Sequence, residues 1–183
     1  MGTRHTTMVI AGEKTKVAQY GQWDGYPSGQ GKTVLKILRR MKRYNQFPAF
    51  LKQLEKARFM NDADQKEMDV FSKYIGSNDG WMNDKQAQLY HAKYPYMSRD
   101  HGATILDLIY KSKDKEILLV DSTEFASGHG GVFGCEWVYV IDLDKMTLTV
   151  YDGTLKSNSV TFDINTLPTQ RGFMKMLKPF EAY

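Results

Sequence analysis

A glycine-rich turn holds the residue types best suited to chemistry in this chain. The segment from Trp23 to Thr33 reads WDGYPSGQGKT, with three glycines and one proline before a lysine and a threonine. Where a strand runs through such a loop into a helix, the backbone N–H groups of the loop and the positive end of the helix dipole attract an anion. Lys32 adds a cation and Thr33 a hydroxyl. We therefore expect an anion site at this turn.

The turn departs from the P-loop of nucleotide triphosphatases. That motif places four residues between its first glycine and the Gly-Lys-Thr triplet, so it needs a glycine at position 26, where Tyr26 stands. Gly25 makes the loop one residue too long, and the segments that follow predict helices rather than a βαβ unit. The structural alternative is that the glycines and Pro27 turn a corner and start the helix.

Aromatic and amide side chains surround the turn, and they suit stacking on a base or sugar and recognition of its edges. A hairpin also brings Arg4 and His5 of the first strand near the turn, and a guanidinium fits a phosphate. An exposed strand face is the alternative for this pair. The predicted pocket binds an anionic small ligand, in first place a nucleotide, through Arg4, His5, Tyr20, Gln22, Trp23, Asp24, Tyr26, Gly29, Gln30, Gly31, Lys32 and Thr33.

A basic helix is the second candidate site. Residues 32–43 hold six cations and no acid, and like charges three or four positions apart repel one another on a helix. A solvated face is the usual explanation of such a run, but this one favours a polyanion or an acidic host protein. The predicted partner face consists of Lys36, Arg39, Arg40 and Arg43. The chain shows no RNA-binding motif, zinc finger or helix-turn-helix, which argues against sequence-specific nucleic-acid recognition.

Cysteine and histidine give weaker signals. Cys135 is the single cysteine and is interpreted as a small buried hydrophobe, because a nucleophile would need a base such as His5, His101 or His129 beside it. The four histidines have no metal-like spacing, so we predict no metal and no cofactor.

Composition places the protein in a broad class. The chain has 183 residues, 13% aromatic residues and a net charge of +4, which is typical of a folded domain. Residues 1–60 contain twelve Lys/Arg and three acids, whereas the rest of the chain contains thirteen and eighteen. The basic part thus points to an anionic partner. A lone cysteine, no signal peptide and no membrane-length apolar run predict a cytoplasmic protein that does not enter membranes.

Residue patterns predict the elements that position these groups. We expect an opening β-hairpin over 3–10 and 16–23, and strands over 117–120, 136–142 and 147–151, with a flexible loop at 127–131. We expect helices over 32–43, from Pro48, over 62–74 after an Asn61 or Asp62 cap, over 83–94, over 102–111 with Asp100 as N-cap, and over 173–177.

The order of these elements predicts an α+β fold. The N-terminal and C-terminal hairpins would form one antiparallel sheet, and the helical middle segment would pack on it. We expect one domain over 1–183, made of the hairpin and turn (1–31), a helical part (32–111) and a part consisting mainly of strands (116–183).

Three segments carry a family resemblance. They are MGTRH at 1–5, KVAQYGQWDGYPSGQG at 16–31 and CEWVYVIDLD at 135–144, and together they resemble a family of uncharacterised proteins from phages, bacteria and fungi. The resemblance brings no activity and no catalytic residue. It implies a phage or mobile-element origin and action on host machinery in the host cytoplasm, such as binding or destroying a nucleotide defence signal.

The leading hypothesis is a binding module without enzymatic activity. Two other functions stay open. The order of hairpin, helix and later hairpins is compatible with an amidohydrolase of the N-terminal-nucleophile type, in which the nucleophile's own α-amine acts as base. Removal of the first methionine would expose Gly2, which has no nucleophile, so this function needs Thr3 at the terminus. The third is a host-protein interaction factor that presents the basic helix. A homo-oligomer is also left open.

Overall fold

The fold is built on one five-stranded sheet. The computed structural model describes residues 2–77, 81–128 and 134–180. The sheet has the order β2-β1-β5-β6-β7, and all neighbours are antiparallel except the central pair β1–β5, which is parallel. The strands are β1 (His5–Ala11), β2 (Lys14–Gly21), β5 (Trp137–Asp142), β6 (Thr147–Tyr151) and β7 (Ser159–Asp163).

The predicted α+β class is confirmed. The two hairpins do share one sheet, but a parallel pair joins them, so the sheet is mostly rather than wholly antiparallel. All six residues of β5 are buried, as expected for a central strand that is covered on both faces. The helices are α1 (Lys32–Arg43), α2 (Phe47–Leu54), α3 (Asp62–Tyr74), α4 (Asp84–Lys93), α5 (Ile105–Lys111), α6 (Thr123–Ser127) and α7 (Gln170–Leu177).

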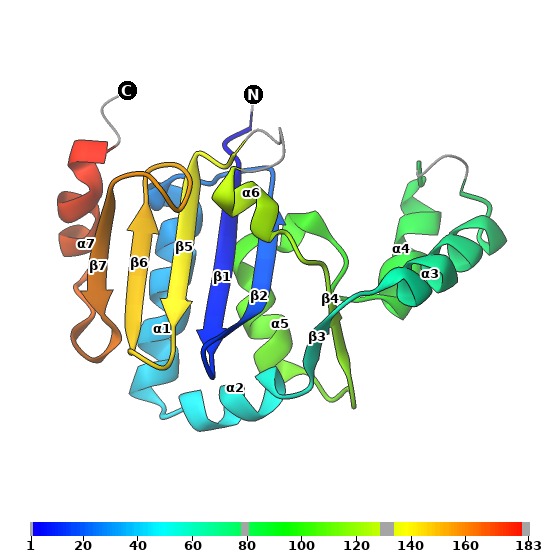
Figure 1. Cartoon of the computed structure of the whole chain (residues 1–183), viewed down its shortest axis with the longest axis horizontal. Coiled ribbons are helices and arrows are strands. Elements are labelled where there is room, and N and C mark those ends of the chain that lie inside the picture. The colour runs from blue at the N-terminus through cyan, green and yellow to red at the C-terminus, as the bar shows by residue number, and fades with distance from the viewer. Residues whose placement is uncertain (1, 78–80, 129–133, 181–183) are drawn as a thin grey trace.

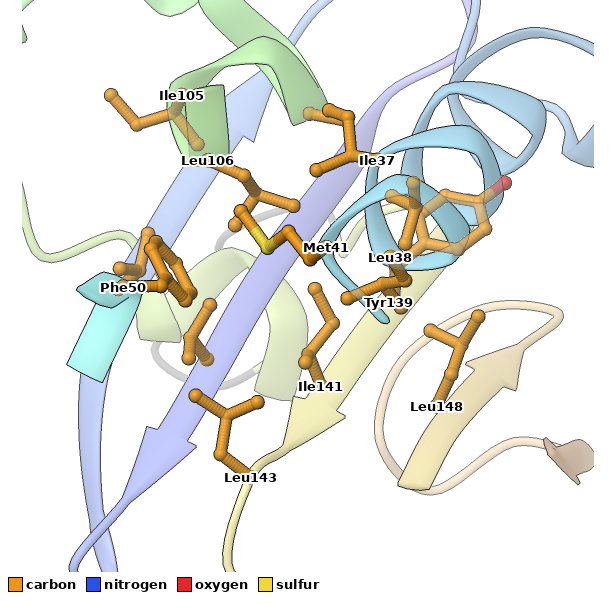
Figure 2. Close-up of a cluster of buried hydrophobic side chains, with 14 of the residues drawn as sticks. Ile37, Leu38, Met41, Phe50, Ile105, Leu106, Tyr139, Ile141, Leu143 and Leu148 are labelled. Carbon is orange, nitrogen blue, oxygen red and sulfur yellow. The ribbon is translucent and has the colours of Figure 1, made fainter. Parts of the chain in front are cut away.

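The main core lies between the sheet and helices α1, α2, α5 and α7 (Figures 1 and 2). The apolar residues of α1 recur at helical spacing and pack against inward-facing residues of β1 and β5, among them Ile141. Every third or fourth residue of α1 is therefore buried, and its cations are left on the opposite side. The buried residues of α1 are Val34, Leu35, Ile37, Leu38 and Met41.

A smaller cluster covers the other face of the sheet under α6. It contains Met8 and Ala18 of the first hairpin, Val138 and Val140 of β5, and Cys135. Side chains of a strand alternate between its two faces, so β1 and β5 supply residues to both clusters. The position of each strand residue thus fixes which cluster its side chain joins.

A second, two-stranded sheet connects the body to a pair of helices. Strand β3 (Ala57–Phe59) runs parallel to β4 (Ile117–Leu119), so the predicted strand at 117–120 exists but pairs outside the main sheet. Beyond these strands, α3 and α4 stand away from the body (Figure 1). Asn61 caps α3 in a capping box, which settles the choice between two predicted caps.

The start of α5 differs from the prediction. Asp100 lies inside a short 3-10 turn, η2 (Arg99–Thr104), which Ser98 caps. Gly102 has φ 47° and ψ −134° there, so α5 begins only at Ile105. The predicted loop at 127–131 falls mostly outside the described residues, since 129–133 are not described. Within the described ranges, no helix is long and apolar enough to cross a membrane.

Candidate anion-binding groove

The glycine-rich turn forms one wide helical turn, η1 (Pro27–Gly31), that continues into α1. Its backbone donors are used inside the turn: the N–H of Gly29 donates to Tyr26 O (2.9 Å), and the N–H of Gln30 donates to Asp24 O (2.9 Å). The N–H groups of Gly31 and Lys32 also donate to carbonyls of the turn. These donors, which the sequence suggested would be open to an anion, are therefore already occupied.

Close packing explains the glycines of this turn. A Cβ at Gly29 would lie 2.3 Å from the carbonyl oxygen of Asp24, and one at Gly31 would lie 3.1 Å from the hydroxyl of Tyr139. That hydroxyl donates to the carbonyl of Gly25 at 2.7 Å. The side-chain oxygen of Gln30 accepts from the backbone of Ala103 at 2.9 Å and so ties the turn to η2. The structural role of these residues thus has direct geometric support.

Arg4 and His5 lie beside the turn, since a Cβ at Gly25 would be 3.0 Å from both the carbonyl oxygen of Arg4 and the Cβ of His5, but the Arg4 side chain is paired and that of His5 is buried. The guanidinium of Arg4 donates twice to the carboxylate of Glu136, at 3.2 and 3.1 Å, and this contact raises the pKa of Arg4. His5 is 1% exposed and lies against Gly21, and neither of its ring nitrogens has a hydrogen-bond partner in the described structure. Burial lowers the pKa of His5 to about 4, so its ring is neutral at pH 7.

The aromatic residues beside the turn divide into two groups. Tyr20 packs on Phe125 with ring centroids 4.5 Å apart, and its hydroxyl donates to Gln22 at 2.6 Å. Trp23 and Tyr26 are 58% and 52% exposed. Neither lines the groove on α1 that is described next. Of the twelve predicted pocket residues, Lys32 and Thr33 line that groove and the other ten do not.

A cationic groove lies on α1 instead. It has a volume of about 330 Å³ and is lined by Lys32, Thr33, Leu35, Lys36, Arg39 and Gln170. The three cations stand four and three positions apart, so they share one face of the helix. No acidic side chain of the described chain lines the groove. The groove combines two residues of the predicted pocket, Lys32 and Thr33, with two of the predicted partner face.

The cationic side chains around this groove differ in the hydrogen bonds and ion pairs that they make. Arg39 donates to the carbonyl of Pro168 at 2.9 Å, so its guanidinium is held near the start of α7. Lys32 and Lys36 make no ion pair among the described residues. Arg40 is different, because it forms a two-point ion pair with Asp107 and contacts Gln46. Arg40 is thus partly neutralised, and the predicted partner face is reduced to Lys36, Arg39 and Arg43.

Among the described residues, no base stands beside Cys135 to activate it as a nucleophile. Its thiol lies 3.0 Å from the hydroxyl of Thr6, and burial raises its pKa to about 11. His5 points to the opposite face of β1 from Thr6, since neighbouring residues of a strand alternate. His101 contacts the carbonyl of Pro95 at 2.7 Å, and His129 lies outside the described residues. The amidohydrolase alternative needs Thr3 at the terminus and stays a prediction.

Neither a search for metal-binding clusters among the described residues nor comparison with known proteins points to a further site. In the ranges that the structure describes, no group of three or more His, Cys, Asp or Glu side chains could hold a metal ion. Comparison of the chain with protein-family models, with curated proteins and with solved structures gives no match. The family resemblance of the three segments therefore stays a prediction. The fold and groove define an α+β protein with a cationic groove along one helix.

Sequence reasoning missed the contribution of α7 to this groove. Gln170 and Pro168 fall in a segment, 161–173, whose residue pattern fits neither a strand nor a helix along its whole length. The structure divides it between β7, a short turn and α7. A Pro-Thr pair before Gln170 was the available signal, because Thr169 caps α7 through its hydroxyl and threonine is a common N-cap.

Proposed function

We propose that this protein binds an anionic small ligand, in first place a nucleotide or nucleotide-like molecule, in the groove between α1 and the start of α7. The observation that carries the proposal is the convergence of Lys32, Lys36 and Arg39 on a groove that no described acid lines. The volume of about 330 Å³ falls at the lower end of the range typical of ligand pockets. The aliphatic stems of Lys32 and Lys36 can supply an apolar surface beside the charges, which suits a ligand with a ring beside its charged group.

Electrostatics favour an anion in this groove. Lys32 and Lys36 are four positions apart on one helix, and such a like-charged pair destabilises a helix by roughly 0.2–0.5 kcal/mol. A bound phosphate replaces this repulsion with attraction to both ammonium groups. The guanidinium of Arg39 adds fixed donors, because its contact with Pro168 already limits its motion. The ligand therefore stabilises the folded state, and a rise in melting temperature should report its binding.

The test is a thermal-shift assay with a panel of nucleotides, cyclic nucleotides and inorganic pyrophosphate at millimolar concentration. We expect at least one nucleotide to raise the melting temperature of the wild-type protein and Lys36→Glu to remove that rise. Lys52→Glu is the matched control, since Lys52 is an exposed lysine on α2 and its reversal changes the net charge equally. No shift with any compound, or a full shift in Lys36→Glu, would contradict the proposal.

A second variant separates the groove from the glycine-rich turn. Trp23 is exposed beside the turn and lies outside the groove lining. We therefore expect Trp23→Ala to keep the ligand-induced shift. If Trp23→Ala loses the shift while Lys36→Glu keeps it, the ligand binds at the turn as the sequence pattern suggested.

A further inference from the structure

The cationic stripe of α1 extends beyond the groove. Lys32, Lys36, Arg39 and Arg43 follow one another at intervals of four, three and four residues, which keeps all four on one face of the helix. Two further grooves lie along it. One, of about 490 Å³, is lined by Arg39, Arg40, Arg43 and Tyr44. The other, of about 260 Å³, is lined by Arg39, Lys42, Arg43, Asn165, Thr166 and Leu167.

Arg39 lines all three grooves and makes them one surface. We call the surface formed by Lys32, Lys36, Arg39, Arg43 and Tyr44 the cationic track. No acidic side chain of the described residues lines any of the three grooves. From Lys32 to Arg43 the track is about 17 Å long, which matches roughly five nucleotides at the 3.4 Å rise of a stacked strand.

Tyr44 gives the track an aromatic end. Its side chain is 61% exposed at the C-terminal cap of α1, and the guanidinium carbon of Arg43 lies 5.5 Å from its ring centroid. Because the guanidinium lies over one face of the ring, the opposite face is the one on which a nucleic-acid base can stack while the cation meets a phosphate. An inorganic anion cannot stack on such a ring, so the ring favours a ligand that carries a base.

We propose that the cationic track binds a single-stranded oligonucleotide, with phosphates along the four cations and a base stacked on Tyr44. This inference rests on the proposed function, because the first groove of the track is the nucleotide groove. Lysine and arginine reach phosphates, and the tyrosine ring meets the face of a base rather than its edge. Binding is therefore tolerant of sequence, in keeping with a chain that has no sequence-reading motif.

The experiment measures fluorescence anisotropy with labelled oligo(dT) of one to ten nucleotides at low salt. We expect affinity to increase with length up to about five nucleotides and then to level off. For the full-length site, log K should fall with log salt at a slope of about −2.8, since each phosphate contact contributes about −0.7. Arg43→Gln should reduce that slope by about 0.7. Oligo(rU) should bind like oligo(dT), because both present the same phosphates and base faces.

Tyr44→Ala tests the stacking step. We expect it to weaken binding of the pentanucleotide about tenfold, within the range measured for loss of one stacked base, and to leave binding of the mononucleotide unchanged. Tyr74→Ala is the matched control, because Tyr74 is 84% exposed on α3, away from the track. Melting temperatures of both variants verify that they fold.

Three results would overturn the inference, and they have different meanings. If mononucleotides bind and the pentanucleotide binds no tighter, the track is not an oligonucleotide site and the proposed function stands. If neither binds, the proposed function fails together with the inference. If an oligoglutamate of equal charge binds as tightly as oligo(dT), and Tyr44→Ala changes neither, the surface belongs to an acidic protein partner.

Discussion

The imidazole of His5 is the one titratable side chain of β1 (His5–Ala11), and it is buried. It lies against Gly21 of β2, where a Cβ would approach its ring carbon Cε1 to 2.1 Å. Thr7, two residues along the same face of β1, is also buried, and its hydroxyl has no partner within the described structure. A buried polar group without a hydrogen bond costs free energy of folding. A charged ring would cost still more in this place, so the stability of the fold depends on the charge state of His5.

We predict that acid weakens the fold through His5. Its pKa is about 4 in the folded protein, below the ordinary 6.5, because burial disfavours the charged ring. The unfolded chain takes up the proton first, so this part of the stability is complete above pH 6.5 and is lost as the pH falls toward 4. Between pH 7.5 and 4.5 the wild-type free energy of unfolding should fall by roughly 2–3 kcal/mol more than that of His5→Phe.

Urea unfolding at the two pH values measures this difference. Thr7→Val is the control and should keep the wild-type pH dependence, because it changes the buried face beside His5 without removing a titratable group. Equal pH dependence in the wild type and His5→Phe would disprove the assignment to His5.

At the level of elements, the sequence predicted the ranges of individual helices and strands better than it predicted which strands pair. Helix α1 spans Lys32–Arg43, the predicted range, because its apolar period fixes both its register and its buried face. Strand β6 also matches its predicted range, Thr147–Tyr151. The parallel pairing of β1 with β5 was not predictable, since it joins segments about 130 residues apart. Residue patterns within each strand do not encode which strand lies beside it.

The candidate site was likewise predictable where it depends on one helix and not where it depends on contacts between distant segments. The charges of the groove were visible in the sequence, since Lys32, Lys36 and Arg39 belong to one basic helix. Its second wall was not, because the packing of α7 against α1 depends on tertiary contacts such as that of Arg39 with Pro168. The aromatic residues near Trp23 suggested a pocket by composition, but composition does not show whether side chains converge or point apart.

Gly29 is predicted to be essential for the turn that starts α1. An added Cβ would lie 2.3 Å from the backbone oxygen of Asp24, and a backbone atom cannot rotate away as a side chain can. Gly29→Ala should therefore lower the free energy of unfolding by about 1–3 kcal/mol, as overpacking typically does. Ser28→Ala is the control in the same turn, because Ser28 is exposed. Chemical denaturation that finds the two variants equally stable would refute this prediction.

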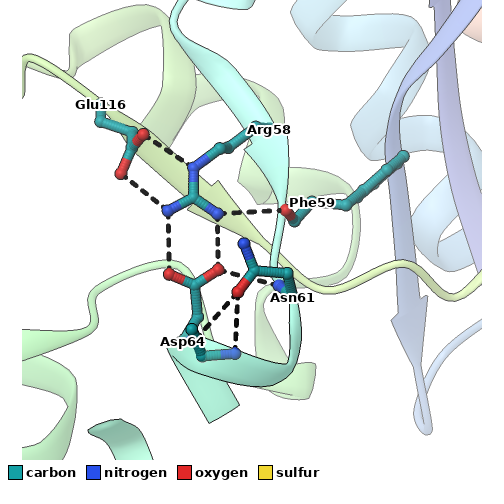
Figure 3. Close-up of polar contacts among 6 residues, drawn as sticks. Arg58, Phe59, Asn61, Asp64 and Glu116 are labelled. Carbon is teal, nitrogen blue, oxygen red and sulfur yellow. Dashed lines mark hydrogen bonds and ion pairs between the residues drawn. The ribbon is translucent and has the colours of Figure 1, made fainter. Parts of the chain in front are cut away.

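For the whole molecule, the helices α3 and α4 form an arm with little core of its own. Neither helix contributes a residue to the two hydrophobic clusters of the body, and Met68 is the one buried residue that the described parts of α3 and α4 contain. A main attachment is polar: the guanidinium of Arg58 on β3 contacts both Asp64 of α3 and Glu116 before β4 (Figure 3). Arg58 lowers the pKa of Asp64 to about 2, so this contact persists in mild acid.

We predict that the arm opens before the body unfolds. Regions with few buried apolar contacts exchange their amide hydrogens through local opening, whereas core strands exchange through global unfolding. Amides of α3 should therefore exchange faster than those of β5 in native-state hydrogen exchange. Arg58→Met should speed exchange in α3 further, because it removes the contacts with Asp64 and Glu116 and leaves the five-stranded sheet unchanged.

Arg40→Met provides the control for this experiment. Arg40 also forms a two-point ion pair, with Asp107 of α5, but both of these residues lie in the body. Its loss should therefore leave exchange in α3 at the wild-type rate. If α3 amides exchange only at the rate of β5, or if the two arginine variants affect α3 equally, the arm folds as one cooperative unit with the sheet, and Arg58 is not its specific attachment.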